Sequence, residues 1–330
     1  MSSGMQSCDV ESRKYFFLAV NTGLVVNGLP DERCRAFYRE RSGPEVYCSI
    51  VGNVVIPGGA PSNSVCSFIS GSPNWKDLAS AILEGGTIAG VQLSSAWEGY
   101  QGIKKFSSKV GAIRGYFEAA RSISREQITN ALDGLERGTE HAVNAGYRHI
   151  QLHAAHGYLF NLLLDYRFSP MVDLVAEYIA HWATELRKIG VETSLRISYG
   201  TGDEQFDLAD GDRALDGMIR NPVDYIDLSH GFYNVNKRLI YPSTPKILAE
   251  RLKINLMVAA RYPEKKFIMS GKSALACEGV LPNNISVGIC RDLIANPNFI
   301  KTRQDGCANC MTCHYFSLGR NNLSCGLWKQ

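Results

Sequence analysis

Three side chains that can donate protons stand close together near the middle of the chain: His153, His156 and Tyr158. They follow an apolar, strand-like run at residues 147–152. Imidazole and phenol groups can hold a developing oxyanion or transfer a proton. Any one of them alone is more often a packed core residue. Three such groups that follow one another directly after a strand favour an active site.

A second concentration of reactive side chains stands near the C-terminus. Cys307, Cys310, Cys313 and Cys325 follow a C-x2-C-x2-C-x11-C pattern. Three thiolates at this spacing can bind one face of a [4Fe–4S] cube, and the fourth can complete the ligand set. A structural zinc site with four cysteine ligands is the alternative. Either way, the spacing predicts a metal centre.

Composition sets the class of protein. The chain has 330 residues, of which 45% are hydrophobic and 20% charged, as in ordinary globular proteins. A net charge of +3, with no basic run, gives no reason to expect a nucleic-acid or membrane partner. Residues 1–14 lack the apolar centre of a signal peptide. We therefore expect a cytoplasmic protein whose cysteines serve metal or redox chemistry rather than disulfides.

Strand-like and helix-like runs alternate along the chain. Residues 124–144 give the clearest helix, which begins with a capping box formed by Ser124 and Gln127. Residues 101–121 are hard to assign, and we expect them to cross the mouth of the fold. The strand-like runs are residues 15–20, 46–51, 88–93, 147–153, 192–198, 223–228, 266–270 and 286–289.

Eight strands, each followed by a helix or helical connection, predict a (β/α)8 TIM barrel. We expect residues 1–304 to form the barrel and residues 305–330 to form a cysteine-rich extension packed on it. An open doubly wound sheet is the alternative architecture. No Gly-x-Gly-x-x-Gly follows an early strand, which counts against that alternative.

The carboxyl ends of barrel strands meet at one mouth, where the chemistry of such folds takes place. Gln92 and Arg196 fall at strand ends and can hydrogen-bond a flat heteroaromatic ring. Gly271 and Arg291 follow the last two strands and suit a phosphate, because glycine admits close backbone N–H groups and arginine offers a bidentate fork. A structural ion pair is the alternative for each arginine. The set predicts a phosphorylated planar cofactor, and FMN is the natural candidate.

Several motifs resemble those of the Old Yellow Enzyme family of FMN-dependent ene-reductases. Residues 153–159, HAAHGYL, resemble the family's His-x-Ala-(His/Asn)-Gly-Tyr-Leu motif. Residues 91–93 (VQL) and 195–198 (LRIS) resemble its third-strand Gln-Leu and fifth-strand Arg motifs. Residues 286–297, SVGICRDLIANP, resemble its closing Gly-Arg-x-x-(Ile/Leu)-Ala-(Asn/Asp)-Pro motif. The resemblance spans almost the whole chain.

The resemblance implies a role for each matched residue. His153 and His156 would hold a substrate oxygen, and Tyr158 would protonate the carbon opposite the transferred hydride. The reaction would be reduction of an activated C=C bond, or the reverse desaturation. The flavin ring or ribityl chain would contact Thr22, Gly52, Gln92 and Arg196, and the phosphate would contact Gly271 and Arg291.

Some positions depart from the family pattern. Residues 94–98 (SSAWE) replace the usual Trp-His-x-Gly-Arg, and Cys290 stands in place of a glycine before Arg291. The loop at residues 165–170 is much shorter than usual, and Thr22 lacks the usual preceding Pro-Met. These changes predict a remodelled mouth. A flavin-dependent amine dehydrogenase that oxidises C–N bonds, and a barrel scaffold that has lost FMN, are the alternative functions.

The cysteine pattern resembles the iron–sulfur subgroup of the same family, which includes 2,4-dienoyl-CoA reductase and trimethylamine dehydrogenase. In those larger relatives the cluster passes electrons between FMN and a second nucleotide-binding half or an external carrier. The present chain ends at Gln330, soon after Cys325. We therefore expect electrons to be exchanged with a separate electron-transfer protein or with NAD(P)H. A homo-oligomer is compatible with the sequence.

Overall fold

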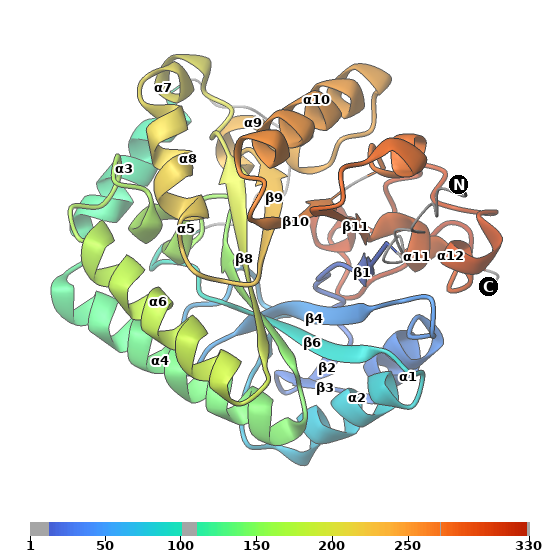
Figure 1. Ribbon diagram of the computed structural model, residues 1–330. Coiled ribbons are helices and arrows are strands. Elements are labelled where there is room, and N and C mark those ends of the chain that lie inside the picture. The colour runs from blue at the N-terminus through green and yellow to red at the C-terminus, as the bar shows by residue number, and fades with distance from the viewer. Residues whose placement is uncertain (1–12, 101–110, 271, 329–330) are drawn as a thin grey trace, which may run out of the picture.

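The computed structural model describes residues 13–100, 111–270 and 272–328. Within these residues, nine strands form one parallel sheet, and β5 (Ser67–Phe68) only extends it outward from β4. The other eight strands form a closed ring (Figure 1). They are β1 (Tyr15–Phe17), β4 (Cys48–Val55), β6 (Ile88–Ser94), β7 (His149–Ala154), β8 (Glu192–Tyr199), β9 (Tyr225–His230), β10 (Lys266–Ser270) and β11 (Ile285–Ile289). The predicted (β/α)8 barrel is confirmed.

The short strand β1 closes the ring. It pairs in parallel with β11 on one side and with β4 on the other. Phe16 and Phe17 each pair with both neighbours, and Phe16 lies opposite Gly288 of β11 and Cys48 of β4. A ring of strands has no free edge to cover, and its strands all end at the same mouth. Polar residues at strand ends are therefore brought together whatever their separation in the sequence.

Helices surround the strands (Figure 1). No helix in the described part of the chain is both long and apolar enough to cross a lipid bilayer. The helices are α1 (Glu32–Glu40), α2 (Pro73–Leu83), α3 (Ala112–Ser122), α4 (Arg125–Ala145), α5 (Leu159–Leu164), α6 (Val172–Lys188), α7 (Glu204–Leu208), α8 (Gly211–Ile219), α9 (Tyr233–Ile240), α10 (Pro245–Arg261), α11 (Arg291–Ala295) and α12 (Phe299–Thr302).

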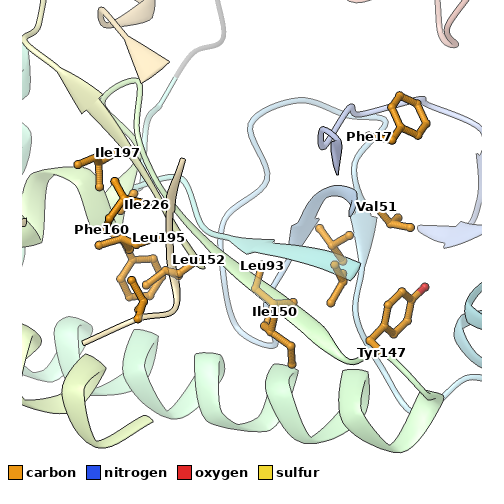
Figure 2. Close-up of a cluster of buried hydrophobic side chains, with 14 of the residues drawn as sticks. Phe17, Val51, Leu93, Tyr147, Ile150, Leu152, Phe160, Leu195, Ile197 and Ile226 are labelled. Atoms are coloured by element: carbon orange, nitrogen blue, oxygen red, sulfur yellow. The ribbon is translucent and has the colours of Figure 1, made fainter. Parts of the chain in front are cut away.

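The main hydrophobic core lies between the strands and this layer of helices. Figure 2 shows part of it, including Leu93, Ile150, Leu152 and Leu195 from three consecutive barrel strands. These four side chains are fully buried. Burying a leucine or isoleucine side chain contributes about 1.5–3 kcal/mol, so this layer holds the strands in register.

Local signals fix several helix ends, including the predicted capping box of α4. Asp31 is the N-cap of α1 and accepts a hydrogen bond from the Cys34 backbone N–H at 3.0 Å. Ser124 and Gln127 form the capping box that starts α4. Gly146 ends α4 with a φ of 104°, in the left-handed region that glycine tolerates. A cap of this kind is worth about 1 kcal/mol.

The sequence of residues 204–219 predicts a single helix, and that prediction is wrong. It is divided into α7 and α8 at Asp210, whose φ is 59°. The Asp207 carboxylate accepts hydrogen bonds from the backbone N–H groups of Thr201 and Gly202, both at 2.8 Å. These bonds tie α7 to the loop before it. Side-chain bonds to backbone compete with regular helix, and here they interrupt it.

The stretch expected to cross the mouth is described only in its second half. Residues 101–110 lie outside the described residues, and α3 follows them. Tyr116 of α3 packs against Phe232, which precedes α9, with ring centroids 4.9 Å apart. Part of the stretch is therefore a helix beside the strand ends.

The C-terminal segment, residues 305–328, packs on the barrel beside β1 and α11 (Figure 1). The Leu323 backbone N–H donates to the Thr22 carbonyl at 2.7 Å. The Cys307 backbone N–H donates to the Asp292 carboxylate at 2.8 Å, and the Trp328 indole N–H donates to the Ile294 carbonyl at 2.8 Å. The division of the chain at residue 304 stays a prediction.

Candidate active site

A tight turn after β7 positions the three residues predicted to be catalytic. His156 and Gly157 both have left-handed backbone, with φ of 62° and 79°. A Cβ on residue 157 would lie 2.3 Å from Cε1 of Tyr116, so only glycine fits there. Tyr158 is the N-cap of α5, and its ring stacks on that of His153 with centroids 4.4 Å apart. The turn reverses the chain after β7 and brings the rings of His153 and Tyr158 together.

A cavity of about 260 Å³ lies at this mouth of the barrel. Its volume is close to the lower end, about 300 Å³, of the range for small-molecule sites. It is bounded by residues that follow β1, β4 and β11, by α9, and by the C-terminal segment. The predicted site residues that line it are His153, His156, Tyr158, Gln92, Arg196, Arg291 and Cys313.

The two cavity histidines differ in which ring nitrogen carries the proton. The Ala155 backbone N–H donates to Nδ1 of His153 at 3.3 Å, so the neutral ring of His153 carries its proton on Nε2. Nδ1 of His156 lies 3.0 Å from the Gly231 carbonyl oxygen, which can only accept, so this nitrogen carries the proton. Nε2 of His156 then accepts from the Ser229 hydroxyl at 3.3 Å. Of the two rings, that of His153 alone has an N–H group with no hydrogen-bond partner among the residues that the structure describes.

Burial keeps both rings neutral. It is the main reason that the pKa of His153 lies well below its ordinary value, and the neighbouring His156 and Arg196 lower it further. Burial, followed by the charge of Arg196, lowers the pKa of His156 to about 3. Both side chains can therefore act as neutral hydrogen-bonding groups at physiological pH, rather than as cations.

Tyr158 is held as a protonated phenol. Burial, and then the nearby Tyr233, raises the pKa of Tyr158 well above its ordinary value, against hydrogen bonds from Ser62 and Asn53 that lower it. The Asn53 amide donates to the Tyr158 oxygen at 3.3 Å. Because that oxygen accepts from Asn53, the phenol's own proton is available for another partner. Asn53 also lines the cavity.

Beneath the cavity, a buried polar network links four neighbouring strands. The Gln92 amide of β6 donates to Gln151 of β7 at 2.6 Å, and Gln151 donates to the Asp227 carboxylate of β9 at 3.4 Å. Arg196 of β8 donates to the same carboxylate. Strand register produces the arrangement, since Gln92 pairs with Gln151, and Arg196 pairs with Asp227. The alternative of a structural ion pair thus applies in part to Arg196, although its side chain also lines the cavity.

Two cationic residues of the cavity, Arg251 and Lys237, carry no signal in the sequence. Arg251 is on α10, is 3% exposed and donates to the Ser270 hydroxyl at 2.6 Å. Lys237 is on α9 and donates to the Ser317 hydroxyl at 2.9 Å, and burial lowers the pKa of Lys237 to about 8. Basic residues within helices usually face solvent, so nothing in the sequence pattern distinguishes these two from ordinary surface positions.

Three residues predicted to bind the cofactor are not found lining this cavity. Thr22 and Gly52 line a much smaller pocket beside it, and the Thr22 hydroxyl accepts from the Leu24 backbone N–H at 3.2 Å. Gly52 allows β4 to approach β6, because a Cβ there would lie 2.7 Å from Cβ of Gln92. Gly271 lies outside the described residues. Their binding roles stay predictions.

The four C-terminal cysteines lie in irregular backbone. Asn309 and Met311 have left-handed φ values of 57° and 61°, which coil the chain between the first three cysteines. Hydrogen bonds from the side chain and backbone of Thr312 lower the pKa of Cys310 to about 7. Burial raises the pKa of Cys313 to about 11, and the other three cysteines lie within electrostatic range of it. The segment therefore brings the four thiols into one neighbourhood.

These thiols are not arranged as a completed metal site. Among the described residues, no group of three or more His, Cys, Asp or Glu side chains is placed so that it could hold one metal ion. Cys310 and Cys325 instead share a hydrogen bond. Their chemistry suits iron or zinc, and the iron–sulfur cluster stays a prediction.

Comparison with known proteins adds one relative. No protein-family model matches the chain. The chain is similar to the NADPH dehydrogenase of Halalkalibacterium halodurans, with 27% identity in an alignment of 189 positions that covers 53% of this chain and 54% of that protein. The chain thus spans about half the length of the curated relative that it matches. This distant similarity and the closed parallel barrel agree with the relationship that the sequence motifs predict.

Proposed function

We propose that the chain is a flavin-dependent oxidoreductase of the Old Yellow Enzyme type. FMN would occupy the cavity at the strand ends, and the substrate would be an activated alkene, or its saturated form in the reverse desaturation. One observation carries the proposal: His153, Tyr158, Arg196 and Arg291 all line the same cavity. His153 can donate a hydrogen bond to a substrate oxygen, and Tyr158 can donate a proton. The two arginines are cations suited to a ring and a phosphate. The similarity to an NADPH dehydrogenase supports oxidoreductase chemistry.

The cavity residues fit a phosphorylated, hydrogen-bonding ring. The positive charges of Arg196, Arg251, Arg291 and Lys237 line the cavity, so it favours an anionic ligand. When bound, FMN supplies the hydride. Arg196 would hold the polar edge of the ring, and Arg291 would hold the phosphate.

His153 would hold the substrate oxygen. Hydride addition to an activated alkene builds negative charge on that oxygen, and a donor aimed at it lowers the barrier. Nε2 of His153 has the proton for this bond. His156 uses its proton on Gly231, so it would reach a substrate oxygen as a donor only after its ring turned over. We therefore give His153 the larger share of the role proposed for both.

Tyr158 would protonate the second alkene carbon. The hydride and this proton together account for the two hydrogens added across the double bond. Asn53 donates to the phenol oxygen, so the Tyr158 proton points away from Asn53. The same bond would stabilise the phenolate that remains after proton transfer. Protons from solvent would then restore the phenol.

We also propose that Cys307, Cys310, Cys313 and Cys325 bind a [4Fe–4S] cluster that relays electrons. Cys313 lines the cavity, whereas Cys310 is exposed, so the cysteine segment extends from the cavity to the surface. A separate electron-transfer protein could exchange electrons at that surface, and NAD(P)H is the other candidate electron donor.

The visible spectrum and metal content of anaerobically purified protein test the proposal. Flavin bands, a broad shoulder that dithionite bleaches, and about four irons per chain are expected. Flavin accompanied by zinc would remove the cluster and leave the flavin enzyme. Protein that is colourless, and stays so after incubation with FMN, would favour the scaffold alternative.

A further inference from the structure

Arg251 is a buried cation with only neutral partners. It comes from α10, lines the cavity and is 3% exposed. Its guanidinium donates to the hydroxyls of Ser270 at 2.6 Å and Ser229 at 3.4 Å, and to the Leu239 carbonyl at 3.5 Å. None of these oxygens carries a charge, so they satisfy hydrogen-bonding positions without neutralising the guanidinium.

The guanidinium is also incompletely bonded. No carboxylate among the described residues forms a salt bridge with Arg251, and its Nε has no hydrogen-bond partner among them. Asp227, the acidic group whose charge acts on Arg251, is already paired with Arg196. A buried charge without a counter-ion is costly, and such charges in proteins are normally paired or bound to a ligand.

Other cations increase this imbalance. Arg196 also donates to the Ser229 hydroxyl, at 3.4 Å, so two guanidinium groups meet at one serine. Arg291 lies within electrostatic range of Arg251 and lines the same cavity. Bringing these guanidinium groups to one cavity costs free energy unless an anion enters. Because Arg251 lines the cavity, that anion has a place beside it.

The position of Arg251 favours the phosphate over the ring. Its shortest contact is to Ser270, the last residue of β10, and β10 is the direct neighbour of β11, which Arg291 follows. A phosphate monoester has several charged oxygens and can accept from two guanidinium groups at once.

We propose that Arg251 is an anion-binding residue of the cavity, and that with Arg291 it binds the phosphate monoester of the flavin. The inference rests on the proposed function, because it requires FMN as the ligand. It adds to the predicted phosphate site a side chain from a helix that no sequence motif marks.

Binding of FMN and of riboflavin, which lacks the phosphate, tests the proposal without measuring turnover. Flavin-free protein is titrated with each ligand and the quenching of flavin fluorescence is recorded. R251Q should weaken FMN binding about 10- to 100-fold, because a charge-assisted bond to phosphate is lost, and should change riboflavin binding less than about twofold. R251K keeps the charge and should recover part of the loss.

Arg41 provides the matched control. It is 4% exposed and donates to the carbonyls of Phe37 and Leu293, but it is not among the cavity residues. R41Q should destabilise the fold and leave both flavin affinities unchanged. If R251Q does not fold, R251K still tests the proposal, because R251K should weaken FMN binding and leave riboflavin binding intact.

Equal weakening of both ligands in R251Q, or no weakening of either, would overturn the assignment. If the unaltered protein bound neither flavin, the proposed function would fail by itself. Inorganic phosphate then serves as the probe. A rise in melting temperature with phosphate that is lost in R251Q would support the anion site, and a rise of equal size in both proteins would reject it.

Discussion

The barrel mouth and the C-terminal cysteine segment contain two kinds of site. At the mouth, the polar side chains come from separate strands and helices and are fixed by each other, as in the bonds of Gln92 to Gln151 and of His156 to Ser229. In the segment, four thiols come from one irregular stretch, and no metal-holding arrangement is present among the described residues. The comparison teaches that the fold alone can organise the first site, whereas the second would be organised by the metal that we propose it binds.

The largest expected effect concerns the segment. Replacing Cys313 by serine should lower bound iron from about four per chain to below about one, because a cluster rarely survives with a ligand missing. Flavin content should stay near one per chain. Cys277→Ser is the control, since the bonds of Cys277 within the described chain are to the nearby Ser273 and Ala274 carbonyls. Iron analysis measures the bound iron, and absorbance measures the flavin content, in both variants. Full iron in Cys313→Ser would break the proposed distinction between the two sites.

At the mouth, the largest effect should come from Tyr158→Phe. This change removes the phenol proton and keeps the ring that stacks on His153. Alkene reduction should slow about 10²- to 10⁴-fold, the usual range for a lost general acid. Reduction of the flavin should be unchanged in stopped-flow measurements. If both half-reactions slowed alike, Tyr158 would not be the proton donor.

The next largest effects should distinguish the role of His153 from that of His156. His153→Phe keeps an aromatic ring and removes the uncommitted N–H, so turnover should fall about 10²- to 10³-fold. His156→Asn can still donate to the Gly231 carbonyl, so we expect a loss of less than about tenfold. Single-turnover rates with a saturating alkene provide the measurement. A larger loss in His156→Asn than in His153→Phe would reverse the roles assigned from the ring protons.

The smallest expected effect is on how the free energy of unfolding depends on pH. Burial lowers the pKa of His156 to about 3, so the folded protein keeps this ring neutral. The unfolded chain, with a histidine pKa of about 6.5, binds the extra proton first as the pH falls. Stability should therefore decline from about pH 6.5 downward, by up to about 1.4 kcal/mol per pH unit for this histidine. Urea unfolding measures the slope, and His156→Asn should flatten it. An unchanged slope would contradict the neutral, buried ring.

Much of the fold can be predicted from the sequence because barrel strands and helices carry local signals. The capping box at Ser124 and Gln127 and the stop at Gly146 each depend on residues a few positions apart, so their types alone indicate them. Helix α5 is not predicted, because it is short, fully buried and apolar on nearly every side, so it shows no periodic polar face. The break at Asp210 depends on Asp207 and the loop before α7, which no pattern within the helix indicates.

The candidate site can be predicted in part for the same reason. Residues at strand ends are expected to converge, and His153, Tyr158, Gln92 and Arg196 do line one cavity. Thr22 follows the first strand in the same way, yet its hydroxyl contacts Leu24 and Cys34 instead of that cavity. The position of a residue at a strand end therefore predicts where its backbone lies, but it does not predict the direction of its side chain.

By itself, the sequence determined the barrel, the clustering of polar strand ends and the local spacing of four cysteines. All of these follow from patterns that recur within a few residues. Only the tertiary structure decided which nitrogen of each histidine carries the proton, and that a helix arginine, Arg251, is buried beside the cavity. Both depend on contacts between residues far apart in the chain. The Gly231 carbonyl fixes the proton of His156, and the hydroxyls of Ser229 and Ser270 hold Arg251.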